Sequence, residues 1–265
     1  GVGVASSSIM GTGSSGTISN NDVVLNALVG IFINGSSTNP VLSNRVSYNG
    51  VSGINVSNAA PTITGNSLVK NGWTGISVDE CAPTLSDNRV FVSSALFDGL
   101  RPRGYYNLNS TSGTFIDNYL RVMEGGIGIF LDGTGAGLTV TGNEVSCRDD
   151  TGATGGGLGV LCEGGDPTVS GNLVAIGNDG DAVRLNGTAA TVSGNDLWND
   201  GGGSAVAVLD SAGVVISSNN METQTYPGVH MLRSSGTVSG NDITGDPVAP
   251  VDEYNTGILI EGSTG

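Results

Sequence analysis

Lysine, histidine and long apolar runs are scarce in this sequence. Among 265 residues there is one lysine and one histidine, and 24 acidic side chains against nine basic ones give a net charge of −15. Such a surface repels nucleic acid and anionic lipid, because both are polyanions. No apolar run reaches the roughly 18 residues needed to cross a bilayer. Nucleic-acid binding and direct membrane insertion are therefore excluded.

Cysteine and aromatic residues are also few, whereas glycine is abundant. The three cysteines, Cys81, Cys147 and Cys162, form no C-x-x-C pair, which argues against a zinc or thioredoxin-like site. A disulfide between Cys147 and Cys162 stays open. The 45 glycines follow no three-residue period and accompany many Asn, Ser and Thr residues. This composition favours β-structure with frequent tight turns.

One internal repeat runs through the chain, and its anchor is an asparagine that usually follows the pattern Thr, apolar, Ser or Thr, Gly. Successive anchors are 22 to 30 residues apart, and the residues three before and two after each anchor are apolar. The ten anchors are Asn21, Asn44, Asn66, Asn88, Asn118, Asn143, Asn172, Asn195, Asn219 and Asn241. Asparagine adopts left-handed turn conformations and hydrogen-bonds neighbouring backbone, so we expect these residues to form a ladder between coils.

A second short segment follows most anchors and reads Gly, apolar, variable, apolar, as in 53–56, 75–78 and 128–131. This alternation is the periodicity of a strand with one buried face. A unit of about 22 residues with two or three such strands cannot bury its apolar face alone, so the units must stack. The sequence predicts an all-β solenoid of about ten coils of 22–23 residues, a single domain over 1–265.

The pattern T-apolar-[ST]-G-N-x-apolar followed by G-apolar-x-apolar resembles the repeats of the pectin-lyase-like superfamily of right-handed parallel β-helices. The resemblance covers nearly the whole chain and implies that fold. It leaves the function open, because the superfamily contains polysaccharide lyases, hydrolases and epimerases, phage tailspikes and surface proteins. Neither end of the sequence predicts a cap over the strand edges. We therefore expect a segment of a longer protein with flanking domains, or end-to-end self-association.

Three coils are lengthened by about six residues at the same place, over 91–104, 146–158 and 244–256. Loops on a rigid scaffold often carry binding residues, so these insertions predict one functional edge. Their aromatic and charged side chains suit stacking on sugar rings and pairing with carboxylates, although solvated loops are the plainer interpretation. The candidate ligand-binding residues are Phe97, Arg101, Arg103, Tyr105, Arg148, Asp149 and Asp150. The third insertion adds Asp246, Asp252, Glu253 and Tyr254.

In enzymes of the superfamily, chemistry is generally carried on an outward strand face. If the middle residue of each second segment points outward, one column reads Phe32, Asn55, Ser77, Asn107, Phe130, Leu161, Arg184, Ala207, His230 and Leu259. A lyase or epimerase needs a base and a cation to stabilise the developing charge, and only Arg184 and His230 offer these groups. The two lie two coils apart, and His230 is also consistent with an ordinary surface histidine.

Two further groups of acidic residues are candidates. Asp132 and Glu163 fall on adjacent coils and could form paired carboxylates for glycoside hydrolysis or calcium binding, but the glycine after each favours a turn. The segment 177–183 distantly resembles a calcium-binding nonapeptide repeat. It nominates Asp179 and Asp181 as metal ligands, with Asp200 from the next coil. Calcium is the one cofactor that these residues suggest.

These features favour a non-catalytic module of extracellular or cell-surface location with a structural, adhesive or glycan-binding role. A polysaccharide or surface glycan is the expected partner. The alternative is a polysaccharide-modifying enzyme, namely a uronate lyase, an epimerase or a glycoside hydrolase, acting along the inserted-loop edge. A third hypothesis is ice binding by the threonines that recur beside the first apolar position, although threonine there is also what an outward strand face prefers.

Overall fold

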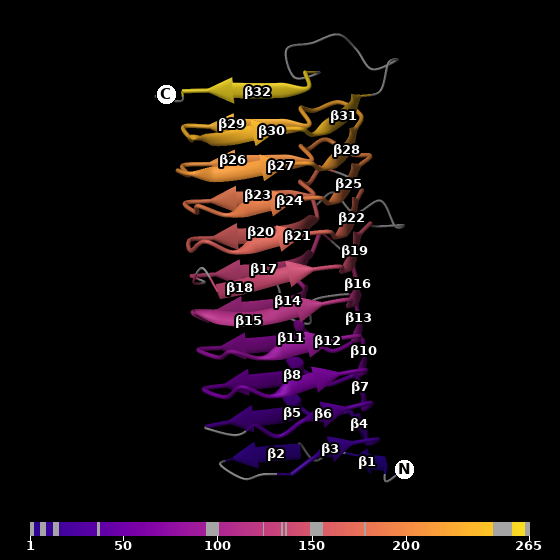
Figure 1. The fold of residues 1–265 in the computed structure, drawn as a ribbon. Coiled ribbons are helices and arrows are strands. Elements are labelled where there is room, and N and C mark those ends of the chain that lie inside the picture. The colour runs from indigo at the N-terminus through magenta and orange to yellow at the C-terminus, as the bar shows by residue number, and fades with distance from the viewer. Residues whose placement is uncertain are drawn as a thin grey trace.

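A computed structural model describes residues 3–5, 9–12, 16–35, 38–93, 101–123, 125–133, 135, 137–148, 156–177, 179–245 and 256–262. In these ranges the chain winds as stacked coils of short strands (Figure 1). The same ranges contain no helix, and hence none long and apolar enough to cross a bilayer. The all-β parallel solenoid expected from the repeat is confirmed.

The strands form three parallel sheets, which we name A, B and C in the order in which the chain enters them. Sheet A contains β1 (Gly3–Ala5), β4 (Asp22–Val24), β7 (Arg45–Ser47), β10 (Ser67–Val69), β13 (Arg89–Val92), β16 (Tyr119–Val122), β19 (Glu144–Cys147), β22 (Leu173–Ile176), β25 (Asp196–Asn199), β28 (Asn220–Thr223) and β31 (Asp242–Gly245). Sheet B contains β2 (Ile9–Thr12), β5 (Val29–Asn34), β8 (Ser52–Ser57), β11 (Thr74–Asp79), β14 (Arg103–Leu108), β17 (Ile127–Asp132), β20 (Leu158–Glu163), β23 (Val183–Asn186), β26 (Val206–Leu209), β29 (Val229–Leu232) and β32 (Ile258–Glu261). Sheet C contains β3 (Ile18–Ser19), β6 (Val41–Leu42), β9 (Thr62–Thr64), β12 (Thr84–Ser86), β15 (Ser112–Ile116), β18 (Gly137–Thr141), β21 (Thr168–Ser170), β24 (Thr191–Ser193), β27 (Val214–Ser217) and β30 (Gly236–Ser239).

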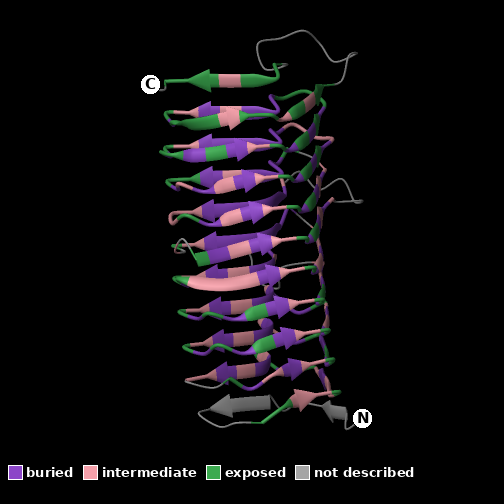
Figure 2. Cartoon of the chain, in the orientation of Figure 1, coloured by how far each residue is buried: buried purple, intermediate pink, exposed green. Residues whose placement is uncertain are grey.

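The core is a set of vertical columns of apolar side chains inside the coils. In sheet C, Val140 pairs with Val169 and Val169 with Val192, and all three side chains are fully buried. Buried residues alternate with intermediate or exposed ones along many strands, as Figure 2 shows. Glycine precedes several inward positions of sheet B. At Gly128, for example, a Cβ would overlap Val145 and the carbonyl of Gly159. The aligned columns confirm that neighbouring coils bury each other's apolar faces.

The three insertions fall at one place in the coil. Each joins a strand of sheet A to the following strand of sheet B, namely β13 to β14, β19 to β20 and β31 to β32. Their flanks therefore lie along the same edge of the solenoid, as the spacing predicts.

The anchor asparagines form a buried ladder at the turn between sheets C and A. The side-chain amide of Asn143 donates to Oδ1 of Asn172 at 2.9 Å and to the carbonyl of Phe115 at 2.9 Å. Its own Oδ1 accepts the backbone N–H of Asn118 at 2.9 Å and that residue's side-chain amide at 3.0 Å. Equivalent bonds join the ten anchors from Asn21 to Asn241. The predicted ladder is confirmed.

The left-handed conformation expected of the anchors belongs instead to the residue before each of them. These ten preceding residues have φ between 52° and 68°, whereas no anchor has a positive φ. Glycine, asparagine, aspartate or serine occupies the position, which explains the Gly of the repeat pattern, since glycine adopts this conformation without a steric cost. The anchor itself supplies the side-chain amide.

A similar ladder at the turn between sheets B and C includes Cys81. Its Sγ accepts the N–H of Ala59 at 3.3 Å and donates to the carbonyl of Asp79 at 2.8 Å. Ser211 Oγ makes the equivalent pair of bonds, accepting from Thr188 and donating to the carbonyl of Leu209. Cys81 therefore performs the hydrogen bonding that serine performs in other coils.

The three cysteines are free and buried, so Cys147 and Cys162, for which the sequence allowed a disulfide, do not form one. Burial raises the pKa of both Cys147 and Cys162 to about 12, and it raises that of Cys81 as well. A thiol with a raised pKa stays protonated near neutral pH and reacts slowly. The three side chains are thus part of the interior and its turns.

We expect Asn143→Ala to lower the free energy of unfolding by about 2–4 kcal/mol, because it leaves several buried hydrogen-bonding groups without partners. Asn21→Ala is the matched control, since among the described residues its side chain makes one ladder bond, to Asn44 at 3.0 Å, and it should cost less. Urea unfolding followed by circular dichroism measures both changes. Equal losses for the two variants would contradict the buried ladder.

Substitution of Cys81 separates hydrogen bonding from packing. Cys81→Ser keeps an acceptor for the N–H of Ala59 and should change stability by less than about 1 kcal/mol. Cys81→Ala removes the acceptor and should cost about 1–3 kcal/mol. Thermal unfolding of the two variants tests this, and a serine variant as unstable as the alanine variant would refute the assigned role.

Candidate functional site

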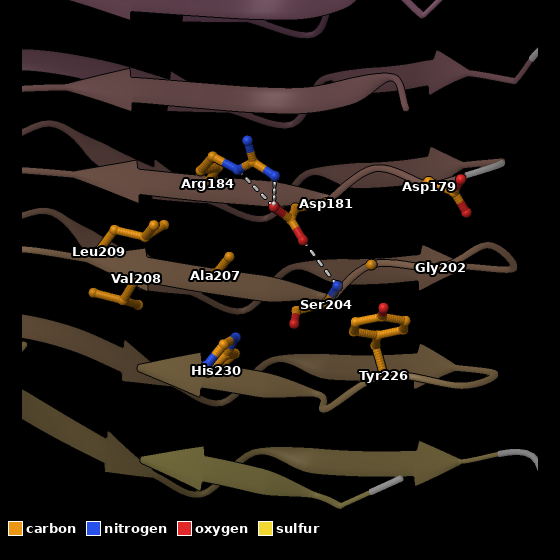
Figure 3. Close-up of a pocket in the computed structure, with 11 residues that line it drawn as sticks. Asp179, Asp181, Arg184, Gly202, Ser204, Ala207, Val208, Leu209, Tyr226 and His230 are labelled. Carbon is orange, nitrogen blue, oxygen red and sulfur yellow. Dashed lines mark hydrogen bonds and ion pairs between the residues drawn. The ribbon is translucent and has the colours of Figure 1, made fainter. Parts of the chain in front are cut away.

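A pocket lies on the outward face of sheet B, where a short side chain is flanked by two long ones. Arg184 of β23, Ala207 of β26 and His230 of β29 are paired in register and form one column, as predicted (Figure 3). Two strand spacings separate the outer residues, which is roughly 10 Å. Because Ala207 has only a methyl group, the column is hollow between Arg184 and His230.

Arg184 is held by Asp181, which lies just before β23. The guanidinium donates from Nε and Nη2 to Oδ2 of Asp181, both at 2.6 Å. The other carboxylate oxygen accepts the backbone N–H of Ser204 at 2.8 Å. The Asp181 side chain is only 7% exposed, whereas that of Arg184 is 40% exposed. A buried carboxylate thus fixes a cation that still reaches solvent.

His230 is held from the coil above. Its Nε2 lies 2.8 Å from Oε2 of Glu261. Glu261 belongs to β32 and stands two residues after Leu259, the residue that pairs with His230. The histidine side chain is 26% exposed and the glutamate side chain 48%. Glu261 therefore orients the only histidine of the chain.

The pocket has a volume of about 270 Å³ and an aromatic wall. Tyr226, which is 38% exposed, stands beside Gly202, and Asp179 lies at the same end of the pocket (Figure 3). Candidate residues from two separate hypotheses, the Arg184 and His230 pair and the Asp179 and Asp181 pair, are therefore brought together. Their arrangement combines a ring surface with oriented donors and acceptors.

The three aspartates proposed as metal ligands do not converge. Asp181 is occupied by Arg184 and Ser204, and Asp200 pairs with Arg148 at 3.0 Å on the outside of sheet A. Within the described ranges, no three His, Cys, Asp or Glu side chains form a group able to hold a metal ion. Two of the three carboxylates nominated for calcium, those of Asp181 and Asp200, are paired with arginine in this structure.

Arg103 of the first insertion is enclosed by rings on the outward face of sheet B. Its guanidinium carbon lies 4.7 Å from the ring centroid of Trp73, 4.1 Å from that of Tyr106 and 4.6 Å from that of Phe130. Burial lowers the pKa of Arg103 and raises that of Tyr106. Arginine stays charged nonetheless, so these contacts are cation–π interactions internal to the chain.

Arg101 links the flanks of the first two insertions. Its Nη1 donates to the carbonyl of Gly156 at 3.2 Å, and its own carbonyl accepts the indole N–H of Trp73 at 3.0 Å. Arg148 of the second insertion lies over the ring of Trp198 at 4.2 Å. The predicted ligand-binding arginines are therefore all engaged with other parts of the chain.

Tyr105 belongs to the core, so its assignment to a binding edge is wrong. The side chain is 1% exposed and stacks on Phe115 with ring centroids 4.4 Å apart. Its neighbour Asn107 is also buried and donates to the Tyr105 hydroxyl at 2.9 Å, so Tyr106 takes the outward position in the column. Burial raises the pKa of Tyr105 far above its usual value.

Asp132 and Glu163 are paired in register on β17 and β20, as their spacing predicts. The hydroxyl of Tyr106 donates weakly to Asp132 at 3.5 Å. Both carboxylates also interact electrostatically with Arg103. Phe97, Asp149, Asp150 and the acidic residues and tyrosine of the third insertion lie outside the described residues.

Comparison with known proteins is consistent with this architecture. The family described as right handed beta helix region matches residues 7–174 and 181–265. The chain belongs to this family. No curated protein is significantly similar in sequence. The match establishes a right-handed β-helix and assigns no activity to it.

Tyr226, Ser204 and Glu261 are pocket or supporting residues that the sequence did not nominate. The sequence held one signal for Ser204. Asp181 and Ser204 both stand two residues before a sheet B strand, so they occupy equivalent positions on adjacent coils. Tyr226 had no comparable signal, since it falls in an irregular turn before β29.

We expect Asp181→Ala to lower the free energy of unfolding by about 2–4 kcal/mol, because Arg184 and the buried N–H of Ser204 lose their acceptor. Asp179→Ala, at an exposed position of the same pocket, should stay within about 0.5 kcal/mol of the parent. Denaturant titration of both variants makes the comparison. A neutral Asp181→Ala variant would contradict the assigned role of the carboxylate.

Proposed function

We propose that this β-helix is a non-catalytic module of extracellular or cell-surface location that binds a neutral glycan in the sheet B pocket. The observation that carries the proposal is the exposed ring of Tyr226 beside polar groups already fixed by neighbours. An aromatic face suits the C–H surface of a sugar, and oriented donors and acceptors suit its hydroxyls. Fixing these groups in advance lowers the entropic cost of binding.

The charge distribution supports a neutral ligand. Arg184 is matched by Asp181, and Arg101, Arg103 and Arg148 contact other parts of the chain. Each of these four guanidinium groups already has a partner within the chain, so none offers a uronate carboxylate an unengaged cation. With a net charge of −15, the protein also repels polyanions.

A structural and adhesive role is compatible with the same binding site. Stacked coils with hydrogen-bonded ladders make a stiff rod, and a rod presents its outward faces at fixed positions. The sparse lysine and low charge content fit an extracellular setting. Location outside the cell is thus part of the proposal on compositional grounds.

One observation favours the alternative of a uronate lyase or epimerase. His230 is oriented by Glu261 at 2.8 Å and shares the pocket with the cation of Arg184. Removal of a proton beside a carboxylate requires a base together with a group that stabilises negative charge. Against this, Arg184 is already bound by a buried carboxylate, which lowers its ability to hold another.

Isothermal titration with cellohexaose and xylohexaose, and with hexagalacturonate as the acidic comparison, tests the proposal. We expect a neutral oligosaccharide to bind without being converted, and Tyr226→Ala to weaken binding on the order of tenfold through loss of stacking. Tyr119→Ala is the control, because Tyr119 lies on sheet A beneath Arg89, away from the pocket.

Two results would overturn the proposal. If none of the neutral oligosaccharides binds, the pocket is not a neutral-glycan site. If hexagalacturonate yields an unsaturated product and His230→Ala abolishes it while circular dichroism is unchanged, the lyase alternative is correct.

A further inference from the structure

A second pocket lies on the outward face of sheet A, on a different side of the solenoid from the first. Three adjacent strands contribute to it, because Leu173 of β22, Asp196 of β25 and Asn220 of β28 pair in register. The next outward column places Trp198 between Ala175 and Glu222. Leu173 is 45% and Trp198 42% exposed, so two large apolar side chains face solvent here.

The ring of Trp198 already contacts one cationic side chain in this structure. The guanidinium carbon of Arg148 lies 4.2 Å from the ring centroid, within the range of a cation–π contact. Arg148 is also paired with Asp200 at 3.0 Å, so its charge is matched from another side. The indole ring thus takes part in binding a positive group and remains partly exposed to solvent.

The lining of the pocket carries acidic groups. It is formed by Leu173, Asp196, Leu197, Trp198, Asn220 and Glu222 around about 230 Å³, and none of these six described residues is basic. Asn220 donates its side-chain amide to Asp196 at 3.2 Å, a contact that orients the carboxylate without neutralising it. The apolar surface therefore adjoins two negative charges on a protein whose net charge is −15.

We propose that this pocket binds an organic cation, an ammonium group carried on an apolar stem. The ammonium lies against the indole of Trp198 between Asp196 and Glu222, and the stem packs on Leu173. Aromatic rings attract such cations through their quadrupole, and carboxylates add Coulombic attraction. The overall negative charge favours the approach of a cationic ligand. This inference is independent of glycan binding in the sheet B pocket.

Choline and 3,3-dimethyl-1-butanol are the decisive pair of probes, because they have nearly the same shape and differ in charge. We expect choline to bind measurably by ligand-observed NMR or calorimetry, more weakly as salt is raised, and the neutral alcohol to bind at least about fivefold more weakly. n-Butylammonium is a second arm, which tells whether a primary amine is accepted as well as a quaternary one.

Variants assign the binding to this pocket. Trp198→Leu should abolish choline binding and Trp198→Phe should retain part of it, since phenylalanine keeps an aromatic face. Glu222→Gln should weaken binding about fivefold. Glu144→Gln is the matched control, because Glu144 is exposed on the same face of sheet A and does not line the pocket.

The proposal is overturned by any of three results. Equal binding of choline and the neutral alcohol would make the pocket a simple apolar groove. Equal weakening by Glu222→Gln and Glu144→Gln would show only a general effect of net charge. Failure of both ammonium probes to bind at millimolar concentration would exclude the site.

Discussion

The interaction on which the structure depends is the hydrogen bond between buried asparagine side chains of successive coils. An anchor asparagine donates both its side-chain amide and its backbone N–H to the side-chain oxygen of the anchor in the next coil, as Asn143 does to Asn172. A buried amide without such partners is costly. A single coil cannot satisfy its own asparagine, so the coils are stable only as a stack, and the same contact holds strands at the spacing of a parallel sheet.

This spacing controls what the surface can do. Outward residues of consecutive coils form columns, so a pocket can form where side chains of different length adjoin. Ala207 leaves the space between Arg184 and His230, and Trp198 stands beside Glu222. Both pockets are made by columns and by the turns next to them, on a backbone whose regularity does not change. Differences between coils therefore locate the candidate sites.

The fold could be predicted from the sequence because it depends on period, and period is visible in apolar positions and anchors. The predicted order of inward and outward residues failed at β14, where Gly-Tyr-Tyr-Asn replaces the usual Gly-apolar-variable-apolar pattern. There a buried Asn107 finds its partner in the hydroxyl of Tyr105, and the large ring fills the core against Phe115. A polar residue on the inward face is not anticipated by hydropathy.

The candidate sites were only partly predictable, because they depend on which long side chains meet. The sequence nominated Arg184, His230, Asp179 and Asp181 separately, and the coil geometry places them in one pocket. It could not indicate that Asp181 binds Arg184, that Glu261 holds His230, or that three rings enclose Arg103. These contacts depend on side-chain conformation, which the repeat does not determine.

Hydrogen exchange at the backbone amides of the anchor asparagines tests the central claim most directly. Each of these N–H groups from Asn21 to Asn219 donates to the side chain of the next anchor. The account predicts slow exchange at all of them, slowest at Asn118, Asn143 and Asn172 in the middle of the stack. Exchange at these central anchors as fast as at exposed turns would contradict it.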